Sequence, residues 1–310
     1  MSKDILYKII ILFLFSVLIK SFIKIYENKK IVVLTRKKKS VGGLLFHYYM
    51  YLGCISNYIF NGYIPIIDLS SYPNIFNGFN ISKTTNPWEQ FFNQPFGYSI
   101  SNIKKKYKNI IYAECQCEKN SPKFNIFYNN IIREYWHKLA NKYIPVKSEI
   151  IREANDKFKF LFNNLINVLG ILIRGTDYIA KKPRGHAIQP NPEMVFKDIK
   201  NMDKKFNYDW IFITTEDDFI REKFKKKFGK RLKYIKSKIN INYDYRKKQF
   251  LAFNSLISGN VYYMRIYLIN VIILSKCLDI ICSKTAGSLV TFILTNGFRN
   301  IKVYNLGYYK

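Results

Sequence analysis

The sequence predicts an α/β protein with parallel β-sheets in two domains. In the second half, short apolar runs alternate with helical patterns, the order that β/α units take in a doubly wound sheet. In the first half, a strand–helix–strand pattern from Lys30 to Asp68 predicts another parallel sheet. A chain of 310 residues is long enough for two hydrophobic cores, and a hydrophobic content of 48% excludes a disordered protein.

Three strands and four helices are predicted in the first half, and one of these helices starts at Pro87 after Asn86. Gly42 and Gly43 form a turn after the first strand, and an apolar, aromatic helix begins directly behind them. Asn61 and Gly62 are a turn signal that separates this helix from the second strand. The predicted strands are Lys30–Thr35, Ile64–Asp68 and Lys108–Ala113, and the other predicted helices are 44–60, 131–143 and 148–169.

The second half alternates regularly between strands and helices. The predicted strands are Val168–Ile173, Trp210–Thr215, Leu232–Ile235, Asp279–Cys282 and Ile301–Tyr304, and the predicted helices are 192–202, 263–277 and two that begin near 216 and 288. A loop rich in Pro and Gly covers 181–192. We therefore expect three regions: a hydrophobic helix over 1–29, an α/β domain over 30–165 and a second α/β domain over 166–310.

The N-terminal region predicts a membrane-associated helix. Residues 9–19 are an unbroken apolar run, which approaches spanning length if Lys8 and Lys20 extend their ammonium groups to the surface. Lysines and arginines are more frequent after this run than before it, so the body of the protein is expected to face the cytoplasm. The pattern leaves open whether the helix spans the membrane or lies flat on it, and a buried helix of a soluble protein is the alternative.

The net charge of +30 usually indicates nucleic acid or an anionic membrane as a partner. Here the lysines are spread along the whole chain, and no zinc-finger spacing, helix-turn-helix signature or aromatic RNA-binding motif accompanies them. The residue usage is typical of an AT-rich genome, which favours a solvated lysine surface. Nucleic acid is therefore not an expected partner, and attraction to anionic lipid is the next alternative.

The five cysteines, which include Cys54, give no disulfide framework. Cys115 and Cys117 are too close to bridge easily and lack the further ligands of a zinc site. Cys277 and Cys282 lie in apolar runs and are expected to be small core residues. This pattern predicts reduced thiols in a cytosolic setting.

Polar residues follow three strands of the second half, where the carboxyl ends of parallel strands meet at one sheet edge and open α/β folds bind ligands. The first junction, Arg174–Asp177, offers an arginine that can bind phosphate oxygens bidentately. The alternative is an Arg174–Asp177 ion pair that only organises a turn. The other junctions are Thr214–Asp218 and Ser283–Ser288, and the last can offer hydroxyls and backbone N–H groups to a phosphate.

These junctions resemble those of the GDP-fucose-dependent fucosyltransferases, a superfamily that contains α-1,6-fucosyltransferases, nodulation fucosyltransferases and protein O-fucosyltransferases. Arg174–Asp177, Thr214–Asp217 and Thr285–Ser288 follow one another in the family's order. The resemblance covers about residues 31–310 and implies a GT-B-like fold with two Rossmann-type β/α/β domains. The family often reads His-x-Arg-Arg-Thr-Asp, whereas this chain has Leu172 and Gly175 in place of the His and the second Arg.

The resemblance implies metal-independent, inverting transfer of fucose from GDP-fucose, or of a sugar from a related GDP-sugar, to a glycan or lipid-linked acceptor. Negative charge would grow on the departing diphosphate, and a buried arginine can stabilise it. The catalytic candidates are Arg174, Asp177 and His186, with Asp177, His186 and Glu89 as candidates for the base that takes the acceptor proton. No metal ion or other cofactor is expected.

The nucleotide-sugar site is predicted by the same resemblance. Gly42 and Gly43 look like the family's first glycine loop, and Asn270 takes the place of its guanine-binding aspartate, with Asp279 as the alternative. The full set of expected binding residues is Gly42, Gly43, Arg174, Thr215, Glu216, Asp217, Asn270, Thr285, Ala286, Gly287 and Ser288.

Two other functions stay open from the sequence. The polar side chains missing at 172 and 175 also fit a non-catalytic protein of the same fold that binds a nucleotide or another anion. The basic composition fits a protein that binds a membrane surface or nucleic acid.

Overall fold

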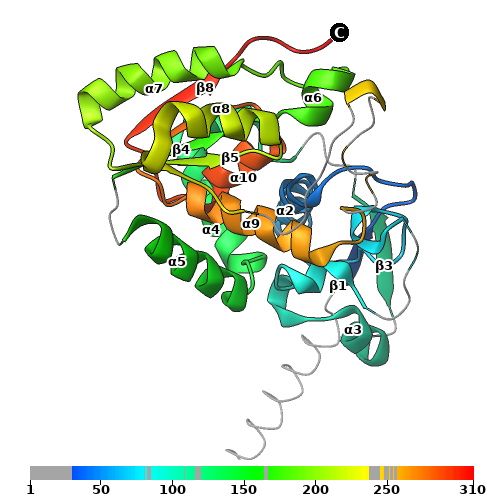
Figure 1. Cartoon of the computed structure of the whole chain (residues 1–310). Helices are drawn as coiled ribbons and strands as arrows, with labels where there is room; N and C mark the ends of the chain where they lie inside the picture. Colours follow the sequence, from blue (N-terminus) through cyan, green and yellow to red (C-terminus); the bar gives the residue numbers. More distant parts are fainter. Residues whose placement is uncertain are drawn as a thin grey trace, which may run out of the picture.

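The computed structural model describes residues 30–79, 81, 85–107, 109–115, 120–163, 167–236, 245–247, 251, 254 and 257–310. Within them lie two parallel sheets, one with three strands in the order β2-β1-β3 and one with five in the order β6-β5-β4-β7-β8. Figure 1 shows the sheets apart, with helix α2 between them. The predicted α/β class with parallel sheets is confirmed.

The first sheet is a β/α/β unit with an added edge strand. Its strands are β1 (Lys30–Thr35), β2 (Tyr63–Ile67) and β3 (Ile110–Glu114), and α2 (Leu44–Phe60) connects the first two. Short helices follow β2: η1 (Ile75–Asn77), η2 (Pro87–Gln90), η3 (Pro95–Gly97) and α3 (Ile100–Lys106). The chain then forms η4 (Phe124–Phe127), α4 (Asn130–Tyr143) and α5 (Ser148–Phe162).

The second sheet is doubly wound. Its strands are β4 (Val168–Leu172), β5 (Trp210–Thr214), β6 (Leu232–Lys233), β7 (Asp279–Ser283) and β8 (Asn300–Tyr304). Its helices are α6 (Thr176–Lys181), α7 (Pro192–Phe206), α8 (Asp218–Phe228), α9 (Val261–Leu274) and α10 (Ala286–Leu294), with short turns η5 (Gly229–Arg231) and η6 (Tyr245–Lys247).

The strand order reverses between β4 and β7, which makes this pair the switch point where such sheets bind ligands. Both strands are buried along their whole length because helices cover the two faces of the sheet. Leu169 and Ile171 of β4 pack with α7 and α8, whereas Val168 and Leu172 face the core that α9 and α10 share. Figure 1 shows α7 and α8 on one side of this sheet and α9 on the other.

Helices α4 and α5 pack against the second half of the molecule. The rings of Phe127 and Phe292 lie 4.4 Å apart, and the His137 ring nitrogen Nδ1 hydrogen-bonds Ile293 O at 2.9 Å. One continuous core therefore includes residues from both sheets. The domain boundary expected at 165/166 stays a prediction.

The helices on either side of β4 differ most from the sequence expectation. The helix predicted over 148–169 ends at Phe162, because Asn163 takes a left-handed conformation with φ 51° that terminates it. Strand β4 begins at Val168, so Val168 and Leu169, which ended the helical pattern, belong to a strand. Helix α6, which begins at Thr176 directly behind the arginine junction, was not predicted.

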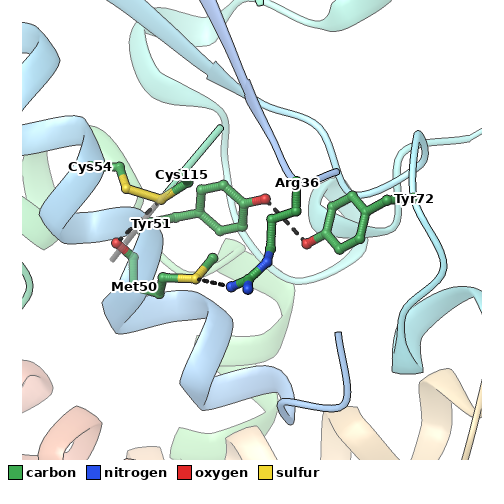
Figure 2. The surroundings of a disulfide bond; sticks show 6 residues. All are labelled: Arg36, Met50, Tyr51, Cys54, Tyr72 and Cys115. Carbon is green, nitrogen blue, oxygen red and sulfur yellow. Dashed lines mark hydrogen bonds between the residues drawn. A yellow bond between two sulfur atoms is a disulfide. The ribbon is translucent and has the colours of Figure 1, made fainter. Parts of the chain in front are cut away.

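The expectation of reduced thiols is wrong for Cys54 and Cys115. These residues form a disulfide that joins α2 to the end of β3 (Figure 2). Their separation of 61 residues gives no recognisable spacing, because the pairing depends on how a helix packs against a strand. Cys277 and Cys282 are free and buried, as predicted, and Cys117 lies outside the described residues.

The predicted N-terminal membrane helix also lies outside the described residues, which begin at Lys30. Among the helices of the described chain, none has the length and apolar character needed to cross a membrane.

Candidate functional site

The first polar junction places Arg174 two residues beyond the end of β4. Its Nε donates to Glu216 Oε1 at 3.0 Å, and one terminal nitrogen, Nη2, donates to Asp177 Oδ1 at 2.8 Å. The guanidinium lies over the ring of Tyr178, 4.7 Å from its centroid. The Arg174 side chain is 19% exposed, so the group is a largely buried cation that these contacts hold in one orientation.

The second junction supplies the carboxylates that organise this turn. Glu216 Oε1 accepts from Gly175 N at 2.9 Å and from the Thr176 hydroxyl at 3.0 Å, in addition to Arg174. Asp217 Oδ1 caps the N-terminus of α8, and its Oδ2 accepts from Thr176 N at 3.1 Å. The two junctions predicted to meet at the sheet edge are therefore in direct contact.

Gly175 is required by this contact. A Cβ atom at residue 175 would lie 2.1 Å from Asp217 Oδ2, so no side chain fits there while Asp217 caps α8. The next residue, Thr176, has φ 36°, a conformation that β-branched residues seldom adopt, and its bonds to Asp217 and Glu216 hold it there. The missing second arginine thus reflects a turn closed by carboxylates.

The third junction begins α10. Thr285 caps the helix by accepting from Ser288 N at 3.2 Å, and Ser288 Oγ accepts from Thr285 N at 2.9 Å and donates to Ser283 O at 2.5 Å. These hydroxyls stabilise the turn, as a capping box does. A Cβ at Gly287 would lie 2.5 Å from the Tyr267 hydroxyl, so the glycine lets that phenol approach the first turn of α10.

Tyrosines that the sequence analysis did not single out complete the site. Tyr267 of α9 is half-buried; its desolvation raises its pKa to about 12, and the charge of Arg174 opposes this rise. Tyr245 donates to Asp217 Oδ2. Helix α9 is apolar on all sides, so a tyrosine in it looked like an ordinary core residue. The position of Tyr267 opposite Gly287 of α10 leaves no pattern in the local sequence.

His186 lies at the same edge of the sheet. Its ring packs edge-on against Tyr178, with centroids 5.1 Å apart. Burial lowers the pKa of His186; Asp177 works against this and Arg174 adds to it, which places both charged groups near the imidazole. The same loop contributes Gln189, whose Oε1 accepts from Arg174 N at 3.3 Å.

The electrostatics of the site couple one buried cation to several carboxylates. Burial disfavours the charged form of Arg174, but Glu216 and Asp177 outweigh it and keep the arginine pKa well above its usual value. Burial raises the pKa of Glu216, and the nearby Arg174 opposes that rise. The arrangement can hold a guanidinium toward a developing negative charge and can exchange a proton at a buried carboxyl group.

Several predicted residues lie elsewhere. Gly43 is the N-cap of α2, and its carbonyl accepts a hydrogen bond from His47. Asn270 is buried in α9, where its amide donates to Ile266 O at 2.9 Å within the same helix. Glu89 lies in η2 of the first half and accepts from Gln94 at 3.0 Å.

Asp279, the alternative guanine ligand, begins β7 and therefore lies at the opposite edge of the sheet from Arg174. It is fully buried and forms an ion pair with Arg299 at 2.5 Å. Tyr208 also donates to it at 2.5 Å, and Asn300 N donates at 2.7 Å. These contacts give Asp279 a role in holding β7 to β8.

Within the described chain, no group of three or more His, Cys, Asp or Glu side chains is arranged to hold a metal ion. The expectation of a metal-independent reaction stays a prediction.

Comparison with solved structures gives the fold. NodZ alpha-1,6-fucosyltransferase soaked with GDP-fucose is similar, with a TM-score of 0.54 and 13% identity over 86% of this chain and 93% of that one. The chain has the fold of this fucosyltransferase. The match to POFUT1 in complex with GDP has a TM-score of 0.49 and 9% identity, and covers 90% of this chain and 99% of that one. The match to a mutant of Arabidopsis thaliana FUT1 in complex with GDP has a TM-score of 0.47 and 10% identity, and covers 88% of this chain and 70% of that one.

The fucosyltransferase fold agrees with the family that the junctions resemble. No protein-family model and no curated protein sequence matches the chain. Because one fold can carry many activities, the activity has to be argued from the side chains at the sheet edge.

Proposed function

We propose that this protein is a glycosyltransferase that moves fucose from GDP-fucose, or a sugar from a closely related GDP-sugar, to a hydroxyl group of a glycan or lipid-linked saccharide. One observation carries the proposal: a buried guanidinium, that of Arg174, lies at the carboxyl edge of the doubly wound sheet. It contacts Glu216 of the second junction and Tyr267, which reaches Gly287 of the third.

The proposed reaction breaks the bond between the sugar C1 and the diphosphate oxygen, and the electron pair leaves with GDP. The acceptor oxygen attacks C1 from the opposite face, forms the new glycosidic bond and loses its proton to a base. Arg174 stabilises the negative charge that develops on the leaving diphosphate, and the first turn of α10 adds the positive end of a helix. Glu216 and Asp177 hold the arginine in orientation.

His186 is our first candidate for the base. Its lowered pKa keeps the imidazole neutral at pH 7, so one ring nitrogen can accept a proton. Asp177 is the second candidate, but its two oxygens already accept from Arg174 and from Leu251 N at 3.1 Å. Glu89, the third candidate, is bound to Gln94 in the first half.

The test is turnover and binding by the full chain. We expect GDP and GDP-fucose to raise the melting temperature more than UDP or dTDP sugars, because a ligand that binds only the native state stabilises it. Replacing Arg174 with Lys keeps a cation but loses the planar fork, and should lower GDP-fucose hydrolysis and transfer at least ~10-fold. Wild-type turnover rates in that variant would remove Arg174 from the mechanism.

A non-catalytic nucleotide-binding protein is the second candidate. The observation that favours it is that two nitrogens of Arg174 already donate to carboxylates, while Leu172 and Gly175 offer no polar side chain. A melting-temperature shift with GDP, together with no hydrolysis or transfer of GDP-fucose across a panel of glycan acceptors, would favour this function over catalysis.

We also infer attachment to a membrane through residues 1–29, with the orientation open to test. The Cys54–Cys115 disulfide supports an oxidising compartment for the first half, in contrast to the cytoplasmic orientation expected from the flanking lysines. Alkylation of free thiols in intact cells, followed by mass spectrometry of the Cys54 and Cys115 peptides, distinguishes an oxidising compartment from the cytoplasm. Alkylated Cys54 and Cys115 would favour the cytoplasm.

A further inference from the structure

Tyr267 occupies the point where the first and third junctions meet. Its hydroxyl would lie 2.5 Å from a Cβ at Gly287, which is the second residue of α10. The phenol also contacts the Arg174 guanidinium. A single side chain from α9 therefore links the arginine to the N-terminus of the helix expected to hold the diphosphate.

Leu172 ends at the same point. Its Cδ1 would lie 3.1 Å from the Cβ position of Gly287, and the residue is fully buried. The side chain of residue 172 and the hydroxyl of Tyr267 thus converge on one glycine. Because leucine cannot donate a hydrogen bond, the nearest hydroxyl at this position is that of Tyr267, with the Thr285 hydroxyl 3.6 Å from the same Cβ position.

Unpartnered hydroxyl groups lie at the same edge of the sheet. Ser283 Oγ, at the end of β7, is fully buried, and Thr214 Oγ1, at the end of β5, is nearly so. Within the described part of the chain, neither oxygen has a hydrogen-bond partner. A buried polar atom without a partner is costly, so this edge of the sheet holds hydroxyl groups that a polar group could satisfy.

We propose that Tyr267 donates a hydrogen bond to the diphosphate of the nucleotide sugar, in place of the polar side chain that residue 172 lacks. The inference rests on the proposed function. The positive charge of Arg174 acts on the phenol, and the Tyr267 hydroxyl lies beside Gly287, so its O–H can be donated toward the first turn of α10. A pKa of about 12 keeps the phenol protonated across the working pH range, so it acts as a donor and not as a base.

The experiment compares Tyr267→Phe with Tyr263→Phe, the same substitution one turn earlier on α9, where the tyrosine is also half-buried. Calorimetric titration of the full chain with GDP and with guanosine is the measurement. Because a hydrogen bond to a charged group is lost, we expect Tyr267→Phe to weaken GDP binding about 10- to 100-fold and leave guanosine binding unchanged. Tyr263→Phe should bind both ligands as the wild type does.

The outcomes separate this inference from the proposed function. Equal GDP affinity of the wild type and Tyr267→Phe overturns the role of Tyr267 even if the protein transfers fucose. Equal losses for GDP and guanosine overturn it too, because they indicate a general change in packing. A wild-type chain that binds no GDP overturns the proposed function itself. In Tyr267→Phe, the further change Leu172→His should restore part of the GDP affinity, since it returns a donor to the same point.

Discussion

The carboxyl edges of the two sheets are built with different chemistry. In the first sheet, neutral amides hold the chain behind β2: Asn86 donates to Ile67 O at 2.6 Å and accepts from Leu69 N at 3.1 Å. Gln94 donates to the same carbonyl at 2.7 Å and accepts from Ile67 N at 2.9 Å. In the second sheet, the corresponding positions carry charges, with Arg174 bound to two carboxylates.

This difference separates structural support from chemistry. A side-chain amide can satisfy both donors and acceptors of a buried backbone without a net charge, so it holds a loop at a small cost in desolvation free energy. Buried ion pairs cost desolvation free energy and rarely add net stability. Arg36 and Asp68 also follow strands of the first sheet, but among the described residues neither forms an ion pair, whereas the switch point of the second sheet holds Arg174 between two carboxylates. The paired charges concentrate the electrostatic field where a charged ligand would bind.

The largest effect is expected when the charged edge loses its cation. Arg174→Met leaves Glu216 and Asp177 buried without a counterion, and should lower the free energy of unfolding by about 3 to 5 kcal/mol at pH 7. Urea denaturation followed by circular dichroism measures this loss. A change below about 1 kcal/mol would show that the two carboxylates are not held by Arg174.

The same variant has a defined pH dependence. Burial raises the folded-state pKa of Glu216 above 4.5, and the positive charge of Arg174, which opposes that rise, is absent in the variant. A carboxyl group with a raised folded pKa binds more protons when folded than when unfolded, so stability falls as the pH rises through that range. Arg174→Met should therefore regain stability between pH 7 and pH 5 more than the wild type does, and an equal change in both proteins would contradict this.

The next largest effect concerns the disulfide of the first half. Reduction, or replacement of Cys54 and Cys115 with Ser, should lower stability by about 2 to 4 kcal/mol, because the closed loop of 61 residues no longer restrains the unfolded chain. Differential scanning calorimetry with and without reductant is the measurement. The double variant should melt at one temperature under both conditions, and reductant should leave GDP affinity at the second sheet unchanged.

A smaller effect tests the tight turn behind β4. Gly175→Ala places a Cβ 2.1 Å from Asp217 Oδ2 and should cost about 1 to 3 kcal/mol, because Asp217 must move away from the start of α8. Gly43→Ala is the matched control, since its Cβ would meet nothing within 4 Å and its φ of −73° suits alanine. Equal stability losses in the two variants, measured by urea denaturation, would remove the steric argument for Gly175.

Strands were predictable because burial on both faces leaves a strong trace in the sequence. Strand β1 has the predicted bounds, and β4 ends one residue before its predicted end, since each is a continuous apolar run. The meeting of Arg174 with Glu216 also followed from strand topology alone, because parallel strands bring their carboxyl ends to one edge.

The other features depend on packing between distant segments. Tyr267 stands in a helix that is apolar on all sides, so its periodicity does not reveal which residue faces Gly287. Cys54 and Cys115 pair because α2 lies against the end of β3, a contact that residue spacing does not encode. Figure 2 shows Arg36, Tyr51 and Tyr72 near this disulfide, a basic and aromatic surrounding that depends on tertiary structure.

The smallest effect is expected at the neutral edge. Asn86→Ala removes the acceptor for Leu69 N and one of the two donors to Ile67 O, and should cost about 1 to 2 kcal/mol, because Gln94 still donates to Ile67 O. Asn86→Asp keeps an acceptor for Leu69 N but loses the donor to Ile67 O, so its urea midpoint should lie between those of the wild type and Asn86→Ala. Because these amides support the fold and lie outside the charged edge, GDP affinity should stay within about twofold in both variants. A loss of GDP affinity comparable to that of Tyr267→Phe would place ligand contacts on the first sheet and remove the division of roles between the two edges.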